Sequence, residues 1–412
     1  MRNSGSLSLS LTTSEPLSNY SEQVRQEFEE HLASALAAEA QDIVPMLERG
    51  TSGGKRLRPV LCRLASDALE GDAHLAFECG VALELIHSGA LIHDDWIDGD
   101  EFRRDAPALW QELGPRTAVL VADLMIATGS LHGAISEATS RSLARCIRSL
   151  SEGAIADYTD HASYTEAIYL KRIKRKTASL YGTAAELGAL VSPRTDMAPL
   201  LYHYGECVGI IYQLADDFVD LLNSLLTGTP VGDLALGIPT LPLTRLERLP
   251  GYRPWVQAFL EERDSGPLIA NGKVRDAQQI CEELLKPWQE RAQGYLQELP
   301  DTPYRELLET VPGAFADELD MDFGAFAREH AVDLDRKANH QLAADLVLRE
   351  RGEGARALDA GRGLVFPDVE DRAASVLLAF EGDGADDALR SVGFGHLFSL
   401  HLIVFFIPPG MS

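Results

Sequence analysis

The chain has 412 residues, of which 45% are hydrophobic, so it can form one large domain or two ordinary ones around a substantial core. Acidic residues outnumber basic ones by 63 to 37, and the net charge of −26 argues against nucleic acid or an anionic membrane surface as the main partner. Five cysteines lie far apart without a CxxC spacing, which indicates neither a zinc site nor a disulfide framework. We therefore expect a protein of the reducing cytoplasm.

Three regions follow one another along the chain. Residues 1–19 lack a continuous apolar stretch, which predicts a disordered leader and not a signal peptide. From residue 20 to 311, apolar residues recur at spacings of three and four and β-branched alternation is scarce, so we expect an all-α helical bundle. Acidic and glycine-rich pieces after Pro312 predict a separate appendage over residues 312–412, whose role the sequence does not fix. No run of 18 apolar residues occurs, so we expect no transmembrane segment.

Two aspartate clusters of the form DDxxD stand 122 residues apart (216 − 94), each after an apolar run. On a helix, residues i and i+4 share a face, and residue i+1 lies about 100° round the axis. Carboxylates grouped in this way repel one another unless a hard cation lies between them, and Mg²⁺ prefers oxygen ligands. The pattern therefore predicts a metal site that holds a diphosphate. Its candidate ligands are Asp94, Asp95, Asp98, Asp216, Asp217 and Asp220.

Cationic and polar residues accompany the aspartates. The turn Gly53-Gly54-Lys55-Arg56-Leu57-Arg58-Pro59 places Lys55 and Arg58 on one face if a helix begins there, where they can bind phosphate or remain solvated. Arg103 and Arg104 can clamp phosphate or neutralise the acidic end of a helix, and the spacing does not decide between these roles. Further candidates are His87, Lys176, Thr177 and Gln213.

Together these motifs resemble a family. GGKRLRP, LIHDDWIDGDEFRR, Lys176-Thr177 and YQLADDFVD, in this order over residues 20–311, are similar to the head-to-tail trans-prenyl diphosphate synthases of the isoprenoid synthase superfamily. The resemblance implies a helical bundle around a central cavity, a homodimer, and a transferase that condenses isopentenyl diphosphate with an allylic diphosphate.

The resemblance also implies roles for individual residues. Asp94, Asp95 and Asp98 would bind two Mg²⁺ ions, and the second cluster would bind a third through Asp216, with Asp220 assisting. Arg103, Lys176 and Gln213 would hold the allylic diphosphate. Lys55, Arg58, His87 and Arg104 would hold isopentenyl diphosphate.

The sequence departs from the family pattern in the loop after the second cluster. Thr229 and Ile238 stand where the family usually has lysines that bind the allylic diphosphate. Two alternatives therefore stay open. One is a terpene cyclase on the same fold, and the other is a non-catalytic partner subunit of an active synthase.

Product length is predicted from the residues before the first cluster. In this family the side chains four and five positions before the first aspartate line the channel for the growing chain, and here these are Ala90 and Gly89. Short-chain enzymes have an aromatic residue there. We therefore expect a product of C20 or longer, and expect Gly89→Phe to shorten it.

Overall fold

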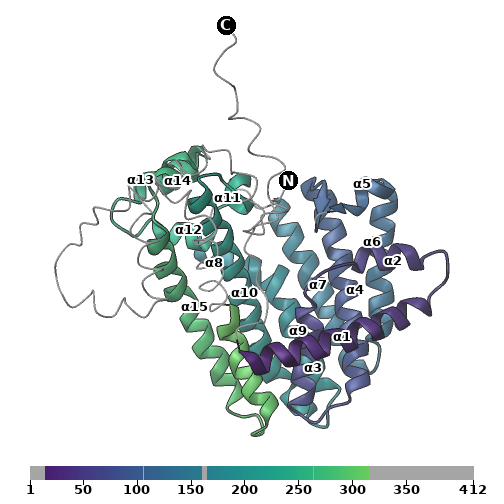
Figure 1. Cartoon of the computed structure of the whole chain (residues 1–412). Coiled ribbons are helices and arrows are strands. Elements are labelled where there is room, and N and C mark those ends of the chain that lie inside the picture. Colours follow the sequence, from purple (N-terminus) through teal and green to yellow (C-terminus); the bar gives the residue numbers. More distant parts are fainter. Residues whose placement is uncertain (1–13, 105, 160–164, 263, 316–412) are drawn as a thin grey trace, which may run out of the picture. The chain divides into compact units, whose positions relative to one another are not determined.

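The computed structural model describes residues 14–104, 106–159, 165–262 and 264–315. The chain divides into two units, Met1–Leu346 and Val347–Ser412, and all described residues belong to the first. These residues are almost entirely helical (Figure 1), which confirms the predicted all-α class. The predicted appendage falls outside the described residues from position 316 onward.

The helices follow one another with short connections. Their bounds are α1 Glu15–Ala37, α2 Val44–Thr51, α3 Leu57–Asp67, α4 Ala73–Asp98, α5 Leu109–Leu113, α6 Pro115–His132, α7 Glu137–Thr159, α8 Glu166–Ile173, α9 Ser179–Leu190, α10 Ala198–Thr227, α11 Gly232–Leu236, α12 Leu241–Leu246, α13 Arg253–Glu262, α14 Gly266–Asn271 and α15 Val274–Leu296. A π-helix, η1, covers Lys174–Ala178, and a 3₁₀-helix, η2, covers Thr195–Met197. Residues 303–315 are also helical.

Helix α1 begins five residues earlier than predicted. The Ser14 side chain caps it by accepting a hydrogen bond from the Leu17 amide at 3.4 Å, and Pro16 lies in the first turn, where its missing N–H costs nothing. Leu17 is fully buried, so residues 15–19 belong to the folded domain and not to a leader. The Ser-Glu-Pro sequence at positions 14–16 was the missed signal.

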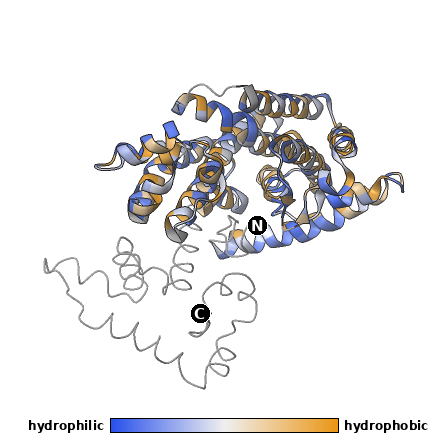
Figure 2. Cartoon of the chain, turned by 90° about the horizontal axis from the view of Figure 1, so that it is seen from above, coloured by the Kyte–Doolittle hydropathy of each residue, from blue (hydrophilic) through white to orange (hydrophobic). Residues whose placement is uncertain are grey.

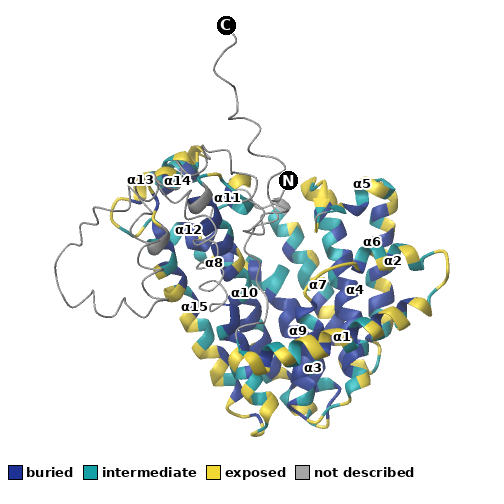
Figure 3. Ribbon diagram, viewed as in Figure 1, coloured by how far each residue is buried: buried dark blue, intermediate teal, exposed yellow. Residues whose placement is uncertain are grey.

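Helices α4, α9 and α10 form the centre of the packing. Helix α10 packs against α9 and α15, and α4 packs against α3 and α6. In Figure 3 these central helices are mostly dark blue, whereas α1 and α15 carry exposed residues. Figure 2 shows apolar and polar faces on the helices, as burial of one stripe requires.

Helix α4 is long and apolar enough to cross a membrane by length and composition, but 72% of its most apolar window is buried inside the protein. A core helix passes the same test, and α4 packs along most of its length. It begins at the Asp72 side chain, which accepts a hydrogen bond from the Leu75 amide at 3.0 Å. It ends at Gly99, whose φ of 73° suits glycine and stops the helix directly after Asp98.

A two-stranded hairpin follows α4 and is the one sheet in the described part of the chain. Strand β1, Phe102–Arg103, pairs antiparallel with β2, Ala106–Pro107, in the register Phe102–Pro107 and Arg103–Ala106. Arg104 lies in its turn with a φ of 52°, a conformation that is unfavourable for a residue with a side chain. The hairpin turns both arginines back toward the protein.

Candidate active site

The first aspartate cluster lies on the last turn of α4 and divides into two parts. Asp95 is buried, and its Oδ1 accepts a hydrogen bond from Arg103 Nε at 2.8 Å. Asp94 is half-buried and Asp98 is exposed, as expected if the i and i+4 positions face a ligand. Burial, above all other causes, raises the pKa of all three carboxyls, and neighbouring aspartates add to the effect. Such carboxyls favour a cation beside them.

The second cluster, on α10, divides in the same way. Asp217 is buried, and its two oxygens accept hydrogen bonds from Tyr169 at 2.5 Å and from Gln213 Nε2 at 3.0 Å. Asp216 is exposed and Asp220 half-buried. Asp217 was predicted to bind metal, but both of its carboxylate oxygens already accept hydrogen bonds within the protein. Asp216 and Asp220 are therefore better placed to offer oxygen ligands to a metal.

Lys176 lies against the first cluster. Its Nζ lies 3.6 Å from Asp94 and 2.9 Å from Asp157, and it also acts electrostatically on Asp233 beside the second cluster. The π-helix η1 sets this position by widening the turn between α8 and α9, a distortion common at functional sites. In the same segment Thr177 donates a hydrogen bond to Gln213 Oε1 at 2.7 Å, so two of the predicted substrate-binding residues are in contact.

Two further carboxylates belong to the site and were not predicted. Asp157 on α7 lies against Lys176, and its Oδ1 is buried without a hydrogen bond from any described residue. Burial, reinforced by Asp220, raises the pKa of Asp233 to about 6 despite the opposing charges of Arg172 and Lys176. A lone aspartate within a helical pattern gives no sequence signal, although Asp233 after Gly232 stands in the loop singled out for its missing lysines.

Glycine at position 232 is required by close packing. A Cβ there would stand 1.7 Å from Asp220 Oδ2, and Gly232 has a φ of 53°. The loop therefore lies directly over the second cluster, which brings Asp233 to Asp220.

A separate cluster of cationic side chains surrounds His87. The pKa of His87 is well below its usual range, so the ring is neutral. Burial is the main cause, followed by the positive charges of Arg58, Arg104, Arg103 and Arg56. Arg58 lies over the Tyr181 ring at 4.8 Å, and its buried Nε has no hydrogen-bond partner among the described residues. Arg104 donates a hydrogen bond to the Ser52 carbonyl at 2.7 Å and packs against Gly53 and Gly54, just before Lys55. A cluster of cationic side chains around a neutral imidazole, with one buried guanidinium N–H unpaired among the described residues, is suited to an anionic ligand.

Arg56, between these residues in sequence, has a different environment. It donates hydrogen bonds to Glu84 at 2.6 Å, to Glu29 at 2.7 Å and to the Thr51 carbonyl at 2.8 Å. Its side chain is 3% exposed, so it stabilises the turn and is not available to a ligand.

Gly89 does not line open space, contrary to the prediction. A Cβ at this position would lie 2.7 Å from the Ala122 carbonyl and 2.8 Å from Ile126, because α4 and α6 cross closely there. Gly89→Phe would therefore disrupt the helix crossing. Ala90 is half-buried and remains the candidate for product length.

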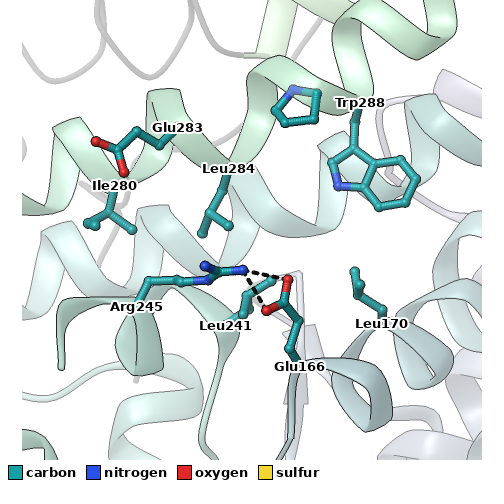
Figure 4. Close-up of a pocket in the computed structure, with 9 residues that line it drawn as sticks. Glu166, Leu170, Leu241, Arg245, Ile280, Glu283, Leu284 and Trp288 are labelled. Atoms are coloured by element: carbon teal, nitrogen blue, oxygen red, sulfur yellow. Dashed lines mark hydrogen bonds and ion pairs between the residues drawn. The ribbon is translucent and has the colours of Figure 1, made fainter. Parts of the chain in front are cut away.

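A pocket of about 320 Å³ lies away from these residues, between α8, α12 and α15. Figure 4 shows the Arg245–Glu166 ion pair, at 2.5 Å, beside Leu170, Leu284 and Trp288. None of the predicted site residues lines this pocket.

Comparisons with known proteins agree with this geometry. The family model "Polyprenyl synthetase" matches residues 41–263, more than half of the chain. The chain belongs to the polyprenyl synthetase family.

The individual relatives are prenyl diphosphate synthases with different names for their products. A short chain isoprenyl diphosphate synthase of Methanothermobacter thermautotrophicus is 36% identical over 48% of this chain and 65% of its own length. Heptaprenyl diphosphate synthase component 2 of Bacillus subtilis is 32% identical over 63% of this chain and 78% of its own. The match to a Sulfolobus acidocaldarius geranylgeranyl diphosphate synthase spans 56% of that protein, so several relatives are matched over less than two thirds of their length.

Solved structures confirm the fold. A Caulobacter crescentus polyprenyl synthase, complexed with calcium and isoprenyl diphosphate, matches with a TM-score of 0.60 and 26% identity, over 77% of this chain and 99% of that one. A geranylgeranyl pyrophosphate synthetase of Geoglobus acetivorans matches with a TM-score of 0.61 and 25% identity, over 74% and 100% of the two chains.

Proposed function

We propose that this protein is a Mg²⁺-dependent head-to-tail prenyltransferase that joins isopentenyl diphosphate to an allylic diphosphate. The observation that carries the proposal is the presence of two different clusters of charged side chains. One has the aspartates of α4 and α10, with Lys176 3.6 Å from Asp94, and the other has arginines around a neutral His87. A reaction between two diphosphates needs both kinds of site, because only the diphosphate that leaves requires metal assistance.

The aspartate site fits Mg²⁺ by its chemistry. Asp94, Asp98, Asp216 and Asp220 offer oxygen ligands, and the raised pKa values of the first cluster indicate carboxylates short of positive charge. When bound, Mg²⁺ would neutralise the charge that develops on the departing diphosphate.

The chain's own residues position the reactants. Arg103 and Lys176 are held by Asp95 and Asp157 at the edge of the metal site, where they can bind the allylic diphosphate. Arg58, His87 and Arg104, with Lys55 nearby, would hold isopentenyl diphosphate with its double bond toward the allylic carbon. Ionisation leaves an allylic cation, the double bond attacks it, and a proton is lost to the departed diphosphate.

A terpene cyclase is the second candidate. Thr229 and Ile238 replace the two lysines that the family usually provides, which weakens the allylic site. A cyclase has no use for an isopentenyl site, however, and Arg58, in the cationic cluster around His87, has a buried Nε without a hydrogen-bond partner among the described residues. This orphaned donor favours the synthase.

The test uses purified protein with Mg²⁺, isopentenyl diphosphate and each allylic diphosphate from C5 to C20, with products identified by mass. We expect linear prenyl diphosphates of C20 or longer that form only when isopentenyl diphosphate is present. Cyclic hydrocarbons formed without isopentenyl diphosphate would establish the cyclase instead.

The proposed product length now depends on Ala90 alone, since Gly89 packs against α6. Ala90→Phe should shorten the product by at least one C5 unit. Unchanged product length in this variant would place the end of the channel elsewhere.

A homodimer is part of the proposal. Leu120 and Leu131 on α6 are 67% and 76% exposed, and Leu124 and Ala127 lie on the same face at helical spacing. Ile155 on α7 is 62% exposed. Leu120→Glu with Leu131→Glu should convert a dimer into a monomer in light-scattering measurements. Leu236→Glu, at a 70% exposed position of α11, is the control and should leave the mass unchanged; a wild-type monomer would refute the dimer.

A further inference from the structure

A cluster of histidine and glutamate side chains lies at the N-terminal end of α4. His74 and Glu78 share one face of α4 at a spacing of four residues, and His31 faces them from α1. One ligand atom from each of the three lies within 4.8 Å of the other two. His31 Nε2 is 2.8 Å from Glu78 Oε1, and the centroids of the His31 and His74 rings are 5.1 Å apart.

This cluster is distinct from the aspartate site. His74 and Asp94 are 20 residues apart on the same helix (94 − 74), which places them about 30 Å apart along its axis. The cluster therefore has no part in the proposed prenyl transfer.

A second layer of side chains holds Glu78 in place. Its other oxygen, Oε2, is 2.8 Å from His132 Nδ1 at the end of α6, and His132 Nε2 lies 4.0 Å from Glu39. With Nδ1 protonated, His132 donates to Glu78 and leaves Oε1 directed at His31. A carboxylate held by an outer hydrogen bond is typical of ligands in metal sites.

We propose that His31, His74 and Glu78 bind a zinc-type divalent cation that fastens α1 to α4. Two imidazoles and one carboxylate form a ligand set that suits Zn²⁺, whereas Mg²⁺ prefers oxygen ligands alone. Ligand atoms around a tetrahedral Zn²⁺ with bonds of about 2.0–2.1 Å lie roughly 3.3 Å apart. The ligand atoms lie within 4.8 Å of one another, and on metal binding side-chain rotation, chiefly of the exposed His74, would bring them to this separation.

No local sequence pattern predicts this site. His31 and His74 are 43 residues apart (74 − 31), and the cysteine spacing argued against zinc. Only the packing of α1 on α4 brings the two histidines together.

The experiment uses the untagged full chain, stripped with a chelator and then held in excess Mg²⁺ so that the aspartates are occupied. Zn²⁺ is titrated by calorimetry, and Co²⁺ is added separately to record its visible spectrum. We expect one Zn²⁺ per chain, a higher melting temperature with Zn²⁺, and a Co²⁺ spectrum of a tetrahedral nitrogen and oxygen site.

The variants His74→Ala and Glu78→Gln should each weaken Zn²⁺ binding at least tenfold. His74 is exposed, so its replacement leaves the fold intact. His203→Ala removes another exposed histidine, on α10, and should bind Zn²⁺ as the wild type does. Absence of Zn²⁺ binding in Mg²⁺, or equal binding in His74→Ala, Glu78→Gln and wild type, would overturn the proposal. These readouts do not depend on prenyl transfer, so they stand or fall separately from the proposed function.

Discussion

Arg56 and Arg58 are two positions apart in one cationic turn but differ in their surroundings. Arg56 pairs with buried Glu84 and with Glu29, while Arg58 has a buried Nε without a partner among the described residues. Removing one partner of a buried ion pair costs about 3–5 kcal/mol, because the other charge remains buried. Losing a charged hydrogen bond to a ligand costs about 1.5–3 kcal/mol of binding.

These surroundings predict opposite effects for one substitution. Arg56→Gln should lower the melting temperature markedly, whereas Arg58→Gln should leave it unchanged and raise the KM for isopentenyl diphosphate by roughly tenfold or more. Thermal unfolding and initial-rate kinetics on both variants check this. Similar behaviour of the two variants in both assays would contradict the division of roles.

The raised pKa of Asp233 predicts that replacing this residue by asparagine increases the free energy of unfolding, and that the increase depends on pH. Its folded pKa of about 6 exceeds the ordinary 3.8, so its charged form opposes folding above pH 6, and this penalty is absent below about pH 4. Asp233→Asn should therefore stabilise the metal-free protein at pH 7.5, by at most about 3 kcal/mol, and leave it unchanged at pH 4.

Denaturant unfolding in the presence of a chelator measures this difference. Asp42→Asn, at an exposed position, controls for the general benefit of removing one negative charge from an acidic protein. Equal stabilisation by both substitutions would show that Asp233 has no special environment.

At the scale of elements, the crossing of α4 and α6 depends on glycine. A Cβ at Gly89 would overlap the Ala122 carbonyl, whereas a Cβ at Gly294 in α15 meets nothing within 4 Å. Gly89→Ala should destabilise the protein by about 1–3 kcal/mol. Gly294→Ala should be neutral or stabilise it by up to about 1 kcal/mol, since alanine is the better helix former. Chemical denaturation compares the two, and a neutral Gly89→Ala would mean that the helices can separate without cost.

The sequence predicted the helical elements and both aspartate clusters because helical spacing is local information. It did not reveal which member of each cluster turns inward. Asp95 and Asp217, the second residue of each pair, are buried. Arg103 and Tyr169 contact them from outside the helices that carry the clusters, and Gln213 contacts Asp217 from one turn earlier on α10. The π-helix that positions Lys176, and the approach of Gly232 to Asp220, likewise depend on tertiary packing that no local pattern records.

For the whole molecule, the folded domain extends beyond the predicted boundary at residue 312. Residues 303–315 are helical, and Phe315 is 1% exposed with its ring 5.4 Å from that of Tyr212. Loss of a buried phenylalanine side chain costs about 3–5 kcal/mol.

Two truncations test this boundary. A chain that ends at Phe315 should melt close to the full-length temperature, and a chain that ends at Pro312 should melt clearly lower, as measured by circular dichroism. If both truncations melt at the same temperature, Phe315 does not contribute to the core as its burial indicates.

Metal-assisted departure of diphosphate is tested by measuring diphosphate release by the wild type and by the variants Asp94→Asn and Asp216→Asn. Each reaction contains an allylic diphosphate and is run with and without Mg²⁺ and isopentenyl diphosphate. Rapid release by the wild type should require both additions, and each variant should lose at least 100-fold, because a neutral amide offers the metal one weaker ligand oxygen and no negative charge. Two results would contradict the role of the aspartates as metal ligands. One is diphosphate release by the wild type without Mg²⁺, and the other is release by both variants at more than a tenth of the wild-type rate.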